Sequence, residues 1–93
     1  MIPITEIESK IREKIRTTHL EVLDLRGGDH IQVIVVSTDF ENKSLVDQHK
    51  IVYDILSAEM KTNEIHALSL KTYSPVQWEE VKGTFKKELG HQI

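Results

Sequence analysis

The sequence contains no cysteine among its 93 residues. This absence excludes disulfide bonds, thiolate nucleophiles and any metal site built from cysteine alone. A role in handling metal would need histidine or carboxylate ligands from this chain, or thiolates supplied by a partner. None of the five histidines stands in the His-Glu-x-x-His spacing of a zinc hydrolase, and no serine or threonine lies in a recognised nucleophile motif. We therefore expect a protein that is not an enzyme.

Long apolar runs and an excess of positive charge are also missing. The longest apolar run, residues 33–36, is far too short to span a membrane. Residues 1–6 have no basic start followed by an apolar core, so we expect no secretory signal. The net charge of −3 and the scattered basic residues argue against a broad nucleic-acid surface.

The residue pattern predicts a single α+β domain over residues 1–93, with a core over about residues 5–89 and a short C-terminal tail. The predicted elements are a helix over 5–16, strands over 19–25 and 30–37, a helix over 44–61, a strand over 65–72 and a helix from 74. This α-β-β-α-β-α order predicts a three-stranded mixed sheet. The first two strands form a hairpin, the third is reached by a parallel crossover, and helices pack on one face.

Two capping patterns predict where helices begin. Thr5 followed by Glu8 fits a capping box at the first helix, in which each side chain satisfies a free backbone N–H. Ser74 is a good N-cap for the last helix, because Pro75 follows it and Gln77 stands at the capping-box position.

Apolar stripes predict which helix faces meet the sheet. The stripe of the second predicted helix consists of Leu45, Val52, Leu56 and Met60. The stripe of the last helix consists of Trp78, Val81, Phe85 and Leu89. We expect Trp78 to be largely buried in the core, in preference to serving as an anchor in an interface.

Three stretches of the sequence together resemble the BolA family. They are residues 27–37, residues 40–53 and residues 65–78, the last reading IHALSLKTYSPVQW. The last stretch is the most specific, because many ordered matches fall within a short window. The resemblance covers about residues 5–80 and implies the class-II KH-like fold of that family, which agrees with the element order predicted above.

The resemblance implies a partner of monothiol glutaredoxins that shares a [2Fe–2S] cluster with them. In such a pair the glutaredoxin supplies one cysteine thiolate and holds glutathione, which supplies another. The BolA-like protein supplies the histidine of its last strand, here His66, and a second ligand from the loop between its first two strands. That loop has no cysteine here, so His30 and Asp29 are the candidates for the second ligand. The chain alone is expected to hold no cluster.

A second function stays open at this point, because KH-like domains also bind nucleic acid. KH domains use a glycine-rich loop to bring their backbone close to phosphates. Residues 40–44 contain no glycine, and Asn42 stands where the family typically has one. We therefore expect an adaptor in iron–sulfur cluster trafficking or iron regulation, with a nucleic-acid-binding transcriptional regulator as the alternative.

Overall fold

The computed structural model of the chain describes residues 3–25, 30–62 and 64–91, with the side chains of the last helix described as far as residue 83. The elements are α1 (Ile4–Lys14), β1 (Thr17–Asp24), β2 (His30–Ser37), the 3₁₀ helix η1 (Thr38–Phe40), α2 (Leu45–Ile55), α3 (Ser57–Lys61), β3 (Ala67–Tyr73) and α4 (Pro75–His91). The connection between the two strands of the predicted hairpin, residues 26–29, lies outside the described residues. None of the described helices has the length and apolar character needed to cross a membrane.

The sheet has the strand order β1-β2-β3, with β2 in the centre. β2 pairs antiparallel with β1 and parallel with β3, so that Val33 lies opposite Val22 on one side and Leu70 on the other. Because strand side chains alternate between faces, these three residues share one face of the sheet. The predicted three-stranded mixed sheet is confirmed.

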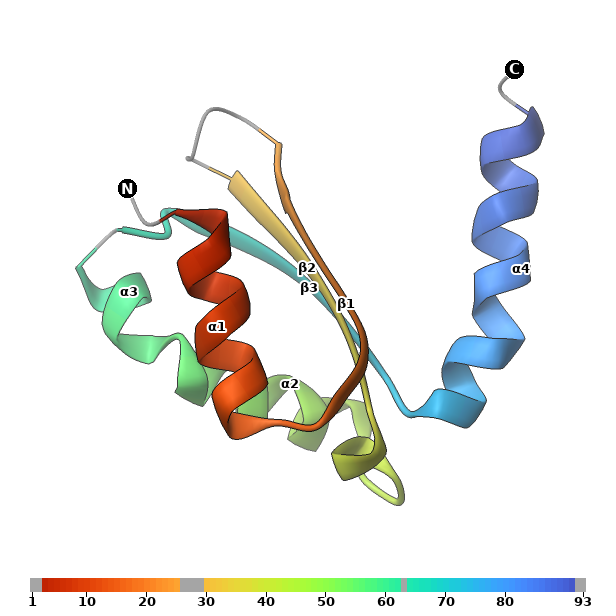
Figure 1. The fold of residues 1–93 in the computed structure, drawn as a ribbon, viewed down its shortest axis with the longest axis horizontal. Helices are drawn as coiled ribbons and strands as arrows, with labels where there is room; N and C mark the ends of the chain where they lie inside the picture. The colour runs from red at the N-terminus through yellow and green to blue at the C-terminus, as the bar shows by residue number, and fades with distance from the viewer. Residues whose placement is uncertain (1–2, 26–29, 63, 92–93) are drawn as a thin grey trace.

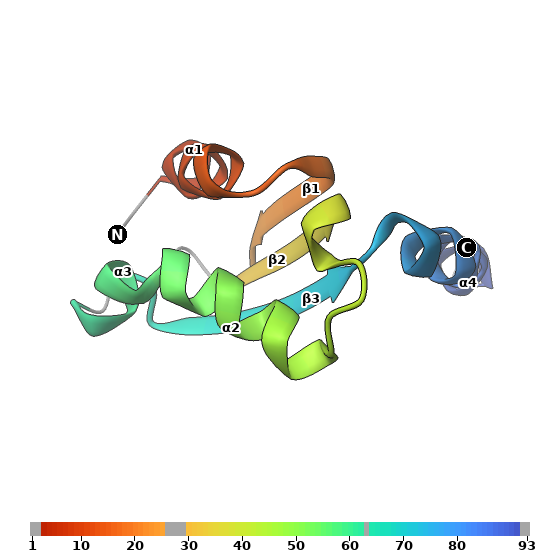
Figure 2. The ribbon, with the colours of Figure 1, turned by 90° about the horizontal axis from the view of Figure 1, so that it is seen from below.

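The core lies between this face and the helices. Figure 1 shows α1, α2 and α3 on the same side of the sheet, and Figure 2 shows α4 apart from them, past the end of β3. The buried cluster consists of Ile7, Ile11, Ile15, Ile31, Val33, Val35, Phe40, Val52, Leu56 and Ile65. Each of these side chains contributes about 1.5–3 kcal/mol through burial. Ile7 and Ile11, four residues apart on α1, therefore face the sheet.

The second predicted helix is in fact two helices, which meet at Leu56. Beyond this residue the hydroxyl of Ser57 donates to the carbonyl of Asp54 at 3.0 Å, a local bond that competes with a regular helix. The prediction that Leu45 belongs to the buried stripe is wrong, since its side chain is 60% exposed. The stripe runs from Leu56 through Val52 to Gln48 at four-residue spacing, which turns Leu45 outward.

One predicted cap is confirmed and the other is wrong. The N–H of Gln77 donates to Oγ of Ser74 at 3.3 Å, and the N–H of Ser74 donates to Oε1 of Gln77 at 2.9 Å, as a capping box requires. At α1 the N-cap position is occupied by Pro3, with no side-chain cap, so Thr5 lies inside the helix. The carbonyl of Pro3 accepts the first helical hydrogen bonds instead, from Glu6 and Ile7.

The prediction that Trp78 belongs to the core is also wrong. Its half-buried ring stacks on His19 of β1, with centroids 4.9 Å apart, and lies 5.5 Å from the ring of Tyr73. His19 points away from the core, because its neighbour Leu20 packs against the core on the other face. α4 begins two residues after β3 ends, so its first turn meets the sheet on this second face. Burial there raises the pKa of Tyr73.

Candidate functional site

His66 lies just before β3, outside the strand that the sequence predicts for it. The chain is held on both sides of this residue. The side chain of Ile65 is fully buried and its N–H donates to the carbonyl of Glu59 at 3.1 Å, while Ala67 lies opposite His30 in the parallel ladder. The side chain of His66 is exposed, and it has no hydrogen bond or ion pair with any residue that the structure describes. The backbone at His66 is thus held in place, while its imidazole is exposed.

His30 is the first residue of β2, and its ring is already engaged. Nε2 of His30 lies 2.7 Å from Oγ of Ser69 on β3, and the side chain is half-buried. Its neighbour Ile31 is in the core, so His30 projects from the other face of the sheet. The structure therefore brings His30 and His66 to the same end of the sheet, with only His30 held by a side chain. Asp29, the other candidate for the second ligand, lies outside the described residues.

His66 and His30 are the two imidazoles that the structure describes at this end of the sheet. Among the described residues, no group of three or more histidine, aspartate and glutamate side chains could hold a metal ion. His66 offers one accessible nitrogen, and imidazole is a suitable ligand for iron.

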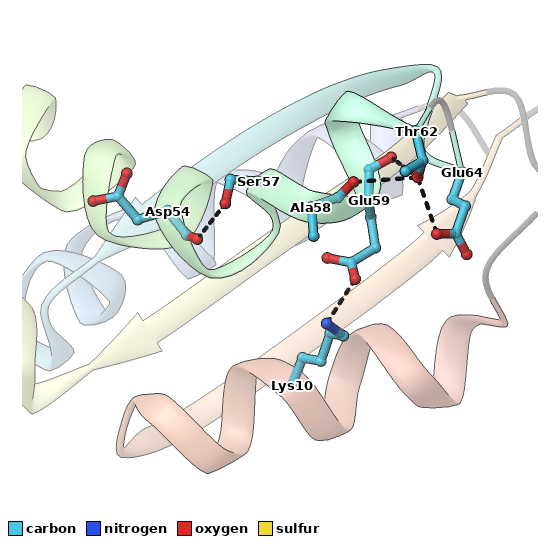
Figure 3. A network of polar contacts seen from close by, with 7 residues as sticks. All are labelled: Lys10, Asp54, Ser57, Ala58, Glu59, Thr62 and Glu64. Carbon is cyan, nitrogen blue, oxygen red and sulfur yellow. Dashed lines mark hydrogen bonds and ion pairs between the residues drawn. The ribbon is translucent and has the colours of Figure 1, made fainter.

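Glu59 anchors the segment that leads to His66, and sequence reasoning missed it. Oε2 of Glu59 lies 2.6 Å from Nζ of Lys10 on α1, as Figure 3 shows. The hydrogen bond from Lys10 holds the pKa of Glu59 below its usual value, against the opposing effect of burial. The same bond raises the pKa of Lys10. No sequence pattern indicates this pair, because its two residues come from different helices.

Gln48 is a second residue that the sequence analysis passed over, although it lies in one of the three resembling stretches. It is 1% exposed, its Nε2 donates to the carbonyl of Lys43 at 3.1 Å, and its Oε1 accepts from Oγ1 of Thr72 at 2.8 Å. These bonds close the loop of residues 40–44 onto the C-terminal end of β3. The four-residue spacing to Val52 is the signal that could have revealed it.

A small cavity at the loop end of the sheet carries a carboxylate. Its volume is about 300 Å³, and it lies next to Leu45 and Tyr73. Among the described residues that line it, the one charged side chain is the carboxylate of Glu80, which would repel a phosphate. Within the loop, Asn42 has a positive φ of 62°, a conformation that glycine adopts freely.

Comparison with known proteins agrees with this fold. The family described as BolA-like protein matches residues 11–77. Protein BOLA2 of Arabidopsis thaliana is 42% identical over 81 residues, which cover 84% of this chain and 85% of that protein. The DNA-binding transcriptional regulator BolA of Escherichia coli is 31% identical over 86 residues, covering 84% of this chain and 81% of that protein.

The structural comparison extends the match over nearly the whole domain. A bol-like protein from Babesia bovis has a TM-score of 0.78 and 31% sequence identity with this chain, over 88% of this chain and 95% of that one. One family accounts for the three resembling stretches, the mixed sheet and the helix arrangement. This chain belongs to the BolA-like family.

Proposed function

We propose that this chain is a non-enzymatic partner of monothiol glutaredoxins and contributes His66 to a [2Fe–2S] cluster shared between the two proteins. The proposal rests on one observation, namely that the side chain of His66 is exposed while its backbone is held in place. Its side chain is exposed and has no bond to the described residues, while Ile65 and Ala67 hold the backbone on either side. A histidine that only stabilised the fold would be expected to have a partner or to be packed.

The chemistry of the chain supports this assignment. With no cysteine to offer, the chain can join a shared cluster only through nitrogen or oxygen, and the thiolates come from the glutaredoxin and its glutathione. A neutral imidazole carries less negative charge than a thiolate, so histidine ligation raises the reduction potential of such a cluster. His30 or Asp29 supplies the second contact. The protein then serves cluster trafficking or iron regulation in a reducing compartment, most simply the cytoplasm.

The test is anaerobic cluster reconstitution of the chain with a monothiol glutaredoxin and glutathione. The substitution His66→Ala is expected to leave the far-UV circular dichroism unchanged, because the side chain is exposed and makes no hydrogen bond to the described residues. The visible circular dichroism and EPR signature of the histidine-ligated cluster is expected to disappear. The matched control is His49→Ala, which removes a half-buried histidine of α2 that contacts Tyr53. Identical spectra for His66→Ala and the parent pair would mean that His66 is not a ligand.

Nucleic-acid binding is the second candidate function, and the name of the Escherichia coli relative favours it. The net charge of −3 and the position of Glu80 in the cavity beside the loop argue against it. Chromatography of the chain on heparin or duplex DNA at low salt distinguishes the glutaredoxin partner from the nucleic-acid-binding regulator. Strong retention that falls steeply with salt would favour the regulator, because phosphate contacts release counterions.

A further inference from the structure

Glu59 is a carboxylate buried between two helices, at 6% exposure. One oxygen bonds Lys10 of α1, whereas the other, Oε1, is buried without a hydrogen-bond partner among the described residues. Replacing a buried ion pair by apolar side chains of similar size often costs no stability. Net stabilisation is therefore a weak explanation for a carboxylate at this position, and a geometric role is a stronger one.

The backbone of Glu59 holds the segment that leads to His66. Its carbonyl accepts the N–H of Ile65 at 3.1 Å and lies 3.4 Å from Oγ1 of Thr62. The hydroxyl of Thr62 also lies 3.0 Å from Oε1 of Glu64, as Figure 3 shows. Thr62 and Ile65 are thus bonded to the last turn of α3, and the main-chain bond from Ile65 to Glu59 is made one residue before His66.

α3 is anchored in the core at its N-terminal end, where its N-cap residue Leu56 is fully buried, and less firmly beyond it. It is five residues long, its N-terminal side is the irregular junction at Leu56, and Met60 is only partly buried. α1 is better anchored, because Ile7 and Ile11 are both fully buried in the core. The directional bond between Lys10 and Glu59 therefore fixes the position of α3 relative to α1.

We propose that Lys10 and Glu59 are positioning residues for His66. Their ion pair fixes α3 against α1, and the bond from Ile65 to Glu59 then fixes where the imidazole of His66 faces a partner. The role of His66 as a ligand rests on the proposed function. The positioning itself is a property of the chain alone and can be measured without a partner.

The first experiment uses the isolated chain. Glu59→Met replaces the carboxylate by an apolar side chain of similar length, and the partly exposed Lys10 can then turn to water. We expect a folded protein with a modestly lower thermal midpoint at neutral pH, amide exchange at Ile65 faster by roughly tenfold while exchange in β2 changes much less, and a lower ¹⁵N order parameter at His66. Glu59→Gln keeps an acceptor for Lys10 and should restore most of the protection. Glu79→Gln, which breaks the exposed pair with Lys82, is the control and should change neither readout.

The second experiment reconstitutes each variant with a monothiol glutaredoxin and glutathione. Glu59→Met is expected to lose the visible circular dichroism of the cluster roughly tenfold faster than the parent pair, with Glu59→Gln close to the parent. If Glu59→Met fails to fold, the variant Lys10→Met/Glu59→Met takes its place, because it leaves no charge at this contact.

Parental exchange at Ile65 and a parental order parameter at His66 in a folded Glu59→Met protein would overturn the positioning role. A different result would overturn the proposed function, namely a parent pair whose cluster spectrum does not change on His66→Ala. In that case the measurements on the isolated chain still decide whether Lys10 and Glu59 position His66.

Discussion

His30 and His66 lie at the same end of the sheet but differ in what holds their rings. The ring of His30 bonds Ser69 of the neighbouring strand at 2.7 Å, whereas His66 has no bond to the described residues. We expect His30→Ala to lower the free energy of unfolding by about 1 kcal/mol, the usual net contribution of one hydrogen bond. Its effect on the shared cluster should be smaller than that of His66→Ala. Urea unfolding and visible circular dichroism of the reconstituted pair measure the two effects.

The variant Ser69→Ala tests whether the bond between His30 and Ser69 accounts for the lower free energy of unfolding of His30→Ala. If the bond between the two side chains is responsible, the double variant costs about as much as either single variant, because the interaction can be lost only once. Costs that simply add would show that His30 stabilises the protein in another way.

Asn42 is the position at which the sequence departs from the family's glycine, and the backbone explains why the exchange is tolerated. Its φ of 62° lies in the left-handed region, which asparagine enters more easily than most residues. The loop of residues 40–44 therefore keeps a glycine-like turn. It lacks the bare backbone that a phosphate could approach closely, which weakens the nucleic-acid interpretation at this residue.

At the scale of elements, Trp78 attaches the first turn of α4 to the sheet on the face opposite the core. Because Trp78 is half-buried against His19 and Tyr73, we expect Trp78→Ala to lower the free energy of unfolding by about 1–2 kcal/mol. A fully buried tryptophan would cost about 3–5 kcal/mol. Chemical denaturation measures the loss, and amide exchange in the first turn of α4 should increase while exchange in β2 stays slow. A loss above about 3 kcal/mol would restore the core assignment.

The sequence predicted elements well where the local pattern determines them. The bounds of β2 are those expected, because a run of branched apolar residues determines them, and the capping box at Ser74 formed as its spacing requires. The junction at Leu56 was missed, because an apolar stripe continues across it at helical spacing. The start of β3 was placed too early, because Ile65 bonds Glu59 of α3 and not the sheet.

The candidate site was harder to predict than the fold. Only the resemblance singled out His66, since one histidine near a strand has no distinctive pattern of its own. What makes it a candidate in the structure is the contrast between an exposed ring and an anchored backbone. That contrast depends on Glu59 and Lys10, which lie 49 positions apart, and no local pattern in the sequence encodes such a contact.

For the molecule as a whole, Glu59 links stability to pH. Its pKa is lowered in the folded protein, chiefly by the bond from Lys10, so the unfolded chain binds a proton there more readily. The stabilisation is present above the ordinary glutamate value of 4.5 and is lost as pH falls through the lowered folded value. We expect the thermal midpoint of the parent to exceed that of Glu59→Gln at neutral pH, with the gap narrowing below this value. If the difference in thermal midpoint between the parent and Glu59→Gln widens in acid, the stabilising role of ionised Glu59 is wrong. Glu79→Gln is again the control.

The composition of the whole chain sets what it can do without a partner. Iron–sulfur clusters are held mainly by thiolates, and this chain has none. Of its five histidines, the structure places two at this end of the sheet, the accessible His66 and the hydrogen-bonded His30, whereas a [2Fe–2S] cluster needs four protein or cofactor ligands. Anaerobic reconstitution of the purified chain should therefore give no visible charge-transfer bands, and the bands should develop only when a monothiol glutaredoxin and glutathione are both added. Omitting glutathione from the mixture is the control, because it removes a thiolate without changing either protein. A stable cluster on the chain alone would show that its own side chains suffice, and the requirement for a thiolate-bearing partner would be wrong.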